Sequence, residues 1–309
     1  MRSNFQIGLI GKGSQFKRVS KILKKLRISF FLYKPDNKNY YNKKEYDQLK
    51  TCKIIFILSP NKTHYSYIKN LSKNRYIFCE KPPVNNRLDL KKIKKLNHKK
   101  IYFNFNFRYS KLANILNKKN TFKLGKLIYG NINICHGLAF KREYSKSWRA
   151  DIKKCKKGVF EIVSVHWVDF LNYFFNLKKI CNIELINFTK KGNSFDNSFC
   201  KVKLKNNAEV DIFSSYSSPL IKKVTLIFSN GIVEQNENYI EIRGPATNYD
   251  NKGHFVRPKL IKKININDEK DYNQSLEASL KYFLKIAKNK KSFSKKDFNC
   301  SLKSNELIL

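Results

Sequence analysis

The side chain with the clearest chemical potential in this sequence is a lysine, Lys81, which stands between Glu80 and Pro82. It follows directly on an apolar run, YIFC, at residues 76–79. A lysine fixed between the end of a strand and a proline is a candidate reactive group. Taken alone it would be an ordinary surface lysine, so its interpretation depends on the elements that position it.

Residues 54–83 supply that context. An apolar run, IIFIL, ends at a turn over residues 59–61, a helical pattern covers residues 63–72, and a second apolar run leads to Lys81. Strand, turn, helix and strand in this order form a βαβ unit, which makes the two strands parallel. Ligands of parallel sheets bind beyond the carboxyl ends of the strands. The turn at residues 59–61 and the corner formed by Glu80, Lys81 and Pro82, here called the lysine corner, are therefore predicted to open into one crevice.

A second candidate ligand site lies near the start of the chain. Residues 5–10 are typical of a buried strand, and Gly11 and Gly13 precede a helical pattern. This is the context of a dinucleotide fingerprint: the first glycine permits a tight turn, and the second lets the backbone approach a pyrophosphate. Phe16 replaces the third glycine, which predicts a helix that sits further from the strand. The glycines alone fit a plain turn equally well.

The end of the second predicted strand, residues 27–33, bears on the type of cofactor. A carboxylate at this place would hold the ribose 2′-hydroxyl of NAD. The sequence has Lys34 there, and Asp36 lies slightly late. Lys34 could meet a 2′-phosphate, which leans weakly toward NADP, or it could be an exposed turn lysine.

The second half of the chain has a different pattern. Strands and helices alternate as far as residue 118, which predicts a doubly wound, Rossmann-type domain over residues 1–118. A strongly apolar helix then covers residues 159–175, where His166 and Asp169 are three apart and therefore neighbours on its surface. Several consecutive strands follow, with a last helix over residues 272–287. They predict an α/β domain with a largely antiparallel sheet over residues 119–309.

Composition limits the classes of partner. The formal net charge of +41 invites a nucleic-acid interpretation. The charge is nearly all lysine, is spread along the whole chain and accompanies no nucleic-acid motif, which favours a solvated surface over specific nucleic-acid binding. Seven cysteines without a CxxC pair indicate reduced thiols in a cytoplasmic protein with no metal site, and no apolar run reaches membrane-spanning length.

Together these motifs resemble the Gfo/Idh/MocA oxidoreductases, the group of glucose–fructose oxidoreductase and inositol dehydrogenase, over nearly the whole chain. The resemblance rests on GLIGKG, the turn at 59–61 with His64, the Glu80-Lys81-Pro82 corner, residues 105–108, Trp148-Arg149, and Gly158 followed by His166 and Asp169. It implies a Rossmann domain followed by an α/β domain with an open mixed sheet, whose exposed face often supports dimers or tetramers.

The activity that the resemblance implies is NAD(P)-dependent oxidoreduction of a sugar, cyclitol or nucleotide sugar, for instance in the making of surface glycans. Lys81 would hydrogen-bond the reacting oxygen, and His166 would act as acid/base. The implied cofactor-binding residues are Gly11, Gly13, Ser14, Lys34, Ser59, Pro60, Asn61, His64, Glu80 and Lys81. The implied substrate-binding residues are Arg108, Trp148, Arg149 and Asp169.

One departure from the family pattern keeps a second interpretation open. Family helices often carry an aspartate four residues before the histidine, and this chain has Ile162 there. Glu161 is adjacent, but one step along a helix rotates a side chain by about 100°, so it cannot simply substitute. The alternative is a non-catalytic relative that binds a dinucleotide and acts as a sensor or partner protein. In that case His166 would be a hydrogen-bonded core histidine.

Overall fold

The computed structural model describes residues 7–35 and 43–309, which form two compact units. Unit 1 contains the described residues up to Phe105 together with Glu277–Leu307 and Leu309. Unit 2 contains Asn106–Leu276 and Ile308. This division differs from the boundary predicted at residue 118. It also assigns the C-terminal residues Glu277–Leu307 to the first unit, whereas the sequence predicted them in the second domain. Asp36 and residues 5 and 6 of the predicted first strand lie outside the described residues.

Unit 1 is built on a five-stranded parallel sheet in the order β2-β1-β3-β4-β5. Its strands are β1 (Ile7–Ile10), β2 (Phe31–Tyr33), β3 (Ile54–Ile57), β4 (Tyr76–Glu80) and β5 (Ile101–Asn104). Strands β1, β3, β4 and β5 are buried along their whole length, which explains their continuous apolar runs. The doubly wound parallel sheet predicted from the sequence is confirmed.

Helices pack around this sheet. They are α1 (Ser14–Lys25), α2 (Lys43–Thr51), α3 (His64–Leu71), α4 (Arg87–Ile93), α8 (Lys295–Ile308) and the second half of α7 (Asp268–Lys288). Phe283 of α7 lies 5.3 Å, between ring centroids, from both Phe56 of β3 and Phe78 of β4. Phe283 also stacks on Phe293, 5.6 Å away. This aromatic core is the physical reason why the C-terminal helices belong to unit 1.

Unit 2 contains an eight-stranded mixed sheet in the order β13-β12-β11-β10-β6-β9-β8-β7, in which only β6 and β9 pair in parallel. Its strands are β6 (Leu127–Cys135), β7 (Leu177–Ile186), β8 (Asn197–Leu204), β9 (Glu209–Ser215), β10 (Ile221–Phe228), β11 (Gly231–Gln235), β12 (Tyr239–Arg243) and β13 (Leu260–Asn265). The predicted mostly antiparallel sheet is confirmed.

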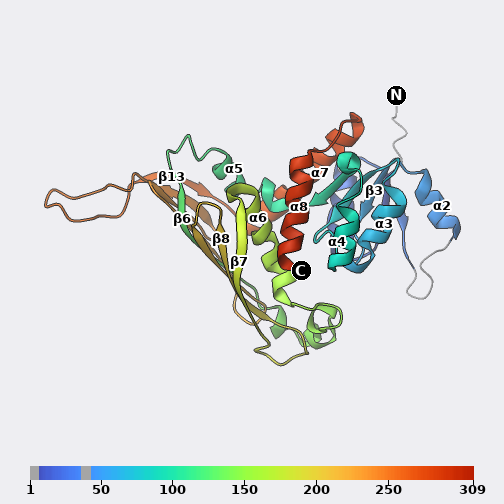
Figure 1. Ribbon diagram of the computed structural model, residues 1–309, viewed down its shortest axis with the longest axis horizontal. Helices are drawn as coiled ribbons and strands as arrows, with labels where there is room; N and C mark the ends of the chain where they lie inside the picture. Colours follow the sequence, from blue (N-terminus) through green and yellow to red (C-terminus); the bar gives the residue numbers. More distant parts are fainter. Residues whose placement is uncertain (1–6, 36–42) are drawn as a thin grey trace. The chain divides into compact units, whose positions relative to one another are not determined.

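One face of this sheet carries α6 (Val165–Phe175), and α5 (Lys111–Asn117) precedes the sheet (Figure 1). Phe160–Ser164, directly before α6, is a π-helix, so the predicted helix over 159–175 changes its winding on the way. Ser164 joins this segment to the sheet, since its hydroxyl donates to Ser214 of β9 at 2.9 Å. Helix α6 is thereby fixed at the end that leads to His166.

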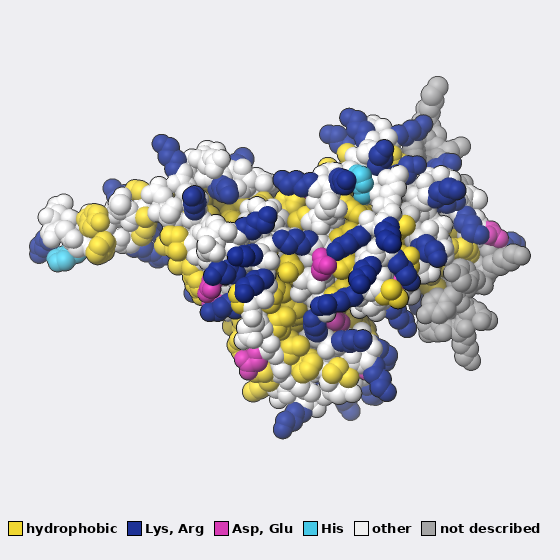
Figure 2. Space-filling view, in the orientation of Figure 1, with side chains coloured by type: hydrophobic (Ala, Val, Ile, Leu, Met, Phe, Trp, Pro, Cys, Tyr) yellow, Lys and Arg dark blue, Asp and Glu magenta, His cyan; other side chains and the backbone are white. Residues whose placement is uncertain are grey.

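The surface bears on the predictions about partners. Figure 2 shows Lys and Arg side chains scattered over the visible face without a single dominant patch, as the solvated-surface interpretation expects. Among the described residues, no helix is both long enough and apolar enough to cross a membrane.

Candidate functional site

The glycine turn of unit 1 is built around Gly11. Its φ is +101°, and a Cβ at this position would lie 2.9 Å from the carbonyl oxygen of Leu58, so no other residue fits without strain. The Gly11 N–H donates to the carbonyl of Tyr33 at 3.1 Å. This bond places the end of β2, and therefore the exposed Lys34 that follows it, beside the turn.

Gly13 differs from Gly11 because a Cβ there would meet no atom within 4 Å. Gly13 precedes α1, whose first turn begins at Ser14 and carries no acidic side chain. Open space beside the free N–H groups of a helix start suits an anion such as a pyrophosphate. Phe16 packs edge-on against Phe30, with ring centroids 6.2 Å apart. The residues present therefore fit a dinucleotide despite the missing third glycine.

The turn after β3 is held by its own hydroxyl groups. Thr63 donates to the carbonyl of Pro60 at 2.8 Å, which leaves Ser59 to donate to the Thr63 hydroxyl at 2.7 Å. Ser59 is buried, whereas Pro60 is exposed and Asn61 is partly exposed. Within this turn, residues 60 and 61 are thus available to a ligand, and Ser59 serves to fix the backbone.

His64 connects this turn with the lysine corner. Its Nε2 lies 2.9 Å from the carbonyl oxygen of Ser59, and its Nδ1 lies 3.0 Å from that of Pro82. Burial lowers the pKa of the ring, and the two carbonyl groups partly offset this effect. His64 is fully buried and both ring nitrogens face the main chain, and its role in binding a cofactor stays a prediction. It positions the loops after β3 and β4.

The carboxylate next to the lysine is held by a chain of buried hydrogen bonds. The Asn104 amide donates to Glu80 at 2.8 Å, the Ser279 hydroxyl donates to the Asn104 carbonyl at 2.7 Å, and Tyr102 therefore donates to Ser279, at 2.8 Å. Burial raises the pKa of Glu80, while Asn104 and the charge of Lys81 oppose this shift. The Glu80 side chain thus supports the corner from inside.

Lys81 itself follows β4 and is partly buried. It lies directly beyond the carboxyl end of a central strand of the parallel sheet, where ligands of such sheets bind. The backbone on both sides is fixed, by Glu80 through Asn104 and by Pro82 through His64. A lysine so placed has the rigid support that a group acting on a substrate requires.

In unit 2, His166 lies on α6 and stacks on Phe107, with ring centroids 4.4 Å apart and planes 19° apart. Phe107 also contacts Trp167 edge-on at 5.3 Å. These contacts fix the plane of the imidazole, which is only partly buried. A neighbouring cavity, lined in part by Phe107, Trp167 and Asp271, measures about 10 Å³. It has room for a single water molecule and is too small for a sugar.

Two predicted substrate residues contact each other in the structure. Arg108 donates to both carboxylate oxygens of Asp169, at 2.8 and 2.6 Å, and both side chains are buried. The guanidinium also covers the ring of Tyr173 at 4.6 Å. They form an ion pair that anchors α6, and their assignment to the substrate stays a prediction. The i, i+3 proximity of Asp169 to His166 did not indicate its partner, which is 61 residues away.

The segment before α6 shows why Glu161 does not replace the missing aspartate. Its carboxylate faces Cys155 and the N–H of Lys157, and burial raises its pKa. Gly158 precedes it with φ +53°, and a Cβ there would lie 1.8 Å from the Phe195 carbonyl oxygen. The backbone at Gly158 thus admits only glycine, and Ile162 leaves the position four residues before His166 apolar.

The remaining predicted substrate residues lie at the surface of unit 2. Trp148 is 41% exposed, and the Arg149 guanidinium lies 4.5 Å from its ring. No signal in the sequence marked Asn104 or Ser279, although each helps to hold a candidate functional group, and Phe107 was marked only as part of the motif at residues 105–108. The polar positions in the run NFNF and the aromatic residue before Arg108 were visible, but their partners were not.

Comparison with known proteins finds a family model that matches part of unit 1. Residues 14–103 match the model of an oxidoreductase family with an NAD-binding Rossmann fold. This match agrees with the family that the sequence motifs indicated, and its NAD-binding fold agrees with a nicotinamide dinucleotide as cofactor. No curated protein matches the chain.

Several solved structures share the fold over nearly the whole chain. A levoglucosan dehydrogenase in complex with NADH and levoglucosan is 13% identical, with a TM-score of 0.78, over 98% of this chain and 95% of its own. A myo-inositol dehydrogenase from Corynebacterium glutamicum is 16% identical, with a TM-score of 0.70, over 98% and 94%. An oxidoreductase from Thermotoga maritima is 15% identical, with a TM-score of 0.77, over 98% and 94%. At these identities the likeness concerns the fold.

Proposed function

We propose, on the premise that the chain belongs to the Gfo/Idh/MocA oxidoreductase family, that it transfers a hydride between NAD or NADP and a carbon of a sugar-like substrate. The carbon bears a hydroxyl group in one direction and a ketone in the other. The substrate class is a sugar, a cyclitol or a nucleotide sugar. Structural neighbours that act on levoglucosan and myo-inositol support this class.

Two side chains carry the chemistry in this proposal. Bound nicotinamide supplies the acceptor or donor of the hydride. Lys81 hydrogen-bonds the reacting oxygen, and its ammonium stabilises the negative charge that develops there. His166 takes the hydroxyl proton as a neutral imidazole during oxidation and returns it during reduction.

The observation that carries the proposal is the construction of the lysine corner. Lys81 lies at the end of β4 within the region that matches the family, and buried groups fix the residues on either side of it. Glu80 is held through three further side chains, although its burial is unfavourable for a carboxylate. A surface lysine without function would not require such support.

The choice between NAD and NADP rests on Lys34. The hydrogen bond from the Gly11 N–H to the Tyr33 carbonyl brings this exposed lysine next to the predicted pyrophosphate site. Its positive charge would attract a 2′-phosphate there. Thermal-shift titrations with both dinucleotides test this directly, since ligand stabilisation follows mass action. Binding should be followed by turnover assays with sugars, cyclitols and nucleotide sugars at the nicotinamide absorbance band. Failure of both dinucleotides to bind would reject the proposal.

A non-catalytic, dinucleotide-binding relative remains the second candidate, because Ile162 replaces an aspartate and Glu161 faces Cys155 instead. In that case the protein binds the cofactor without turnover over the whole panel. The variant Ile162→Asp separates the two functions. Turnover that appears only in this variant would identify the natural chain as a sensor or partner protein.

Assembly into a dimer or tetramer fits the outer face of the eight-stranded sheet. This face exposes Phe199, which stacks on Phe213 of the neighbouring strand at 4.6 Å. Exposed apolar side chains that adjoin on a sheet are typical of interaction surfaces. Light scattering after size exclusion measures the mass, and Phe199→Lys should shift an oligomer to monomer.

A further inference from the structure

A buried donor beside the candidate acid/base has no partner in the described chain. Trp167 follows His166 on α6, and its indole N–H is buried without a hydrogen-bond acceptor among residues 7–35 and 43–309. The residue is only 2% exposed. Buried donors are nearly always satisfied, either by protein groups or by ordered water. The indole of Trp167 therefore indicates an acceptor that is not part of the chain.

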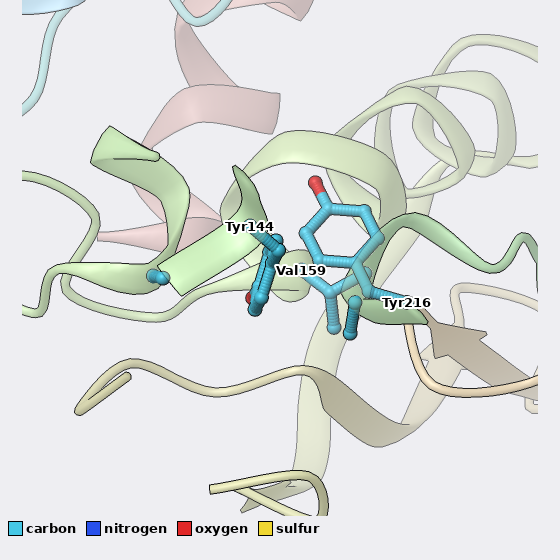
Figure 3. Close-up of a cluster of buried hydrophobic side chains, with 5 residues drawn as sticks. Tyr144, Val159 and Tyr216 are labelled. Atoms are coloured by element: carbon cyan, nitrogen blue, oxygen red, sulfur yellow. The ribbon is translucent and has the colours of Figure 1, made fainter. Parts of the chain in front are cut away.

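A missing partner alone is not sufficient, as the hydroxyl of Tyr144 shows. It is also buried and has no hydrogen-bond partner in the described part of the chain. Tyr144, however, belongs to a cluster of buried hydrophobic side chains that includes Val159 and Tyr216 (Figure 3). A bound water needs about two to four polar partners, and the other side chains of this cluster are apolar apart from Tyr216. Tyr144 is therefore a comparison for Trp167 and not a second site.

Trp167 differs from Tyr144 because it lines the cavity of about 10 Å³ in unit 2. The walls of this cavity also contain Lys222 of β10, Gln235 of β11, and Asp271 and Ser275 of α7. Gln235, Asp271 and Ser275 are all buried. The volume matches about one water molecule, and the walls offer enough polar groups to bind it. The unpartnered N–H and the polar cavity are thus two independent signs of a small bound molecule.

The charges and donors of the walls select the kind of molecule. The Trp167 N–H requires an acceptor, so a bare cation would leave it unsatisfied. The Asp271 carboxylate, which accepts from the N–H of Lys111 at 3.0 Å, would repel an anion. Burial raises the pKa of Asp271, but the Lys111 N–H and the charge of Lys222 oppose this shift. The Lys222 ammonium already has Asp268 as a partner. A neutral molecule that both accepts and donates satisfies these groups, and water is the one that fits the volume.

The position of the cavity links it with the histidine. Phe107 forms another part of the wall and stacks on His166, with ring centroids 4.4 Å apart. Phe107 also contacts Trp167 edge-on at 5.3 Å. A molecule bound between Trp167 of α6 and Asp271 of α7 therefore joins two helices at the aromatic rings that fix the plane of the imidazole.

We propose that a single water molecule occupies this cavity as a fixed part of unit 2. Its oxygen accepts the indole N–H of Trp167, and it donates one hydrogen bond to the carboxylate of Asp271. The water thereby joins α6 to the first turn of α7. The site depends on neither a dinucleotide nor a sugar, so the inference goes beyond the proposed function.

A crystal structure of the natural chain tests whether the cavity is occupied. We expect a water within about 2.7–3.2 Å of both Trp167 Nε1 and a carboxylate oxygen of Asp271. In solution, NOE and ROE spectra between water and the indole protons should show a long-lived contact at Trp167. Trp148, which is 41% exposed, is the internal comparison and should show only short-lived hydration. An empty cavity, or a protein acceptor on the Trp167 N–H, would overturn the inference.

A matched pair of variants tests whether the water contributes to stability. The chain has two tryptophans, so Trp148→Phe leaves Trp167 as the only one. Replacing tryptophan by benzothienylalanine in this variant puts sulfur in place of the indole N–H and keeps the shape of the ring. We expect the melting temperature to fall by about 2–4 °C, because the buried water loses a hydrogen bond.

Tyr144→Phe is the control, because it also removes a buried hydrogen-bonding group that has no partner in the described part of the chain. Since no polar cavity wall depends on that hydroxyl, the melting temperature should stay the same or rise. Equal changes in the two variants would contradict a water bound at Trp167.

Discussion

The strand ends of unit 1 and helix α6 of unit 2 hold their candidate functional groups by different physical means. In unit 1 the lysine corner is supported by neutral donors and by main-chain carbonyls, through Asn104, Ser279 and His64. In unit 2 the histidine helix is anchored by a buried ion pair, Arg108 with Asp169. The difference teaches that charged side chains near a candidate site can also serve to hold its elements in place.

The largest effect should come from breaking the ion pair. Asp169→Ala leaves the Arg108 guanidinium buried without its carboxylate, which we expect to cost about 3–5 kcal/mol of unfolding free energy. Urea denaturation measures this. The matched double variant, Arg108→Met with Asp169→Leu, should recover most of the loss. A loss below about 1 kcal/mol for Asp169→Ala would show that the pair does not anchor α6.

The neutral network of unit 1 should respond less. Asn104→Leu removes the donor to Glu80 and the acceptor of Ser279, and we expect a loss of about 1–3 kcal/mol. Ser279→Ala, which removes one link further away, should cost less. If Asn104→Leu were as stable as the natural chain, Glu80 would not depend on this network.

A third change separates binding from stability at the glycine turn. Gly13→Ala places a methyl group in open space, so the melting temperature should hold while the dissociation constant of the dinucleotide rises about tenfold, or 1.4 kcal/mol. Gly11→Ala is the contrasting variant, since its Cβ would press on Leu58 and lower stability. Unchanged cofactor affinity in Gly13→Ala would show that the dinucleotide does not bind at this turn.

The smallest effect concerns the pH dependence of stability. Burial raises the pKa of Glu80 above its ordinary 4.5, so its contribution to stability is full below that value and is lost as the pH rises through the folded-state value. Gln at this position accepts the Asn104 hydrogen bond and does not titrate. The stability of Glu80→Gln relative to the natural chain should therefore increase with pH over this window. An opposite slope would mean that the carboxylate is stabilised in the fold.

The sequence predicted the architecture of unit 1 well because buried parallel strands leave continuous apolar runs between turns. It missed β13, whose side chains are nearly all exposed, and α8, whose charged residues obscure its apolar face. The strand predicted over residues 27–33 is shorter, because Arg27 has φ +55° and β2 begins at Phe31. The pattern of side chains alone could indicate neither these two elements nor the residue at which β2 begins.

The candidate site shows the same limit. Topology alone brought residues 59–61 and Lys81 to the carboxyl ends of adjacent strands, so their place could be predicted. The side chains that support the lysine corner could not be predicted, because Ser279 is 175 residues from Asn104 in the chain. The ion pair between Arg108 and Asp169 was likewise invisible to local spacing.

The central claim, that Lys81 acts on the substrate, is tested most directly by one paired measurement on Lys81→Met: the dissociation constant of the dinucleotide and the rate of nicotinamide absorbance change. Lys62→Met, at an exposed lysine in the turn after β3, is the matched control. We predict that Lys81→Met binds the dinucleotide as the natural chain does and that its turnover is abolished, while the control keeps both. Normal turnover in Lys81→Met would contradict the account.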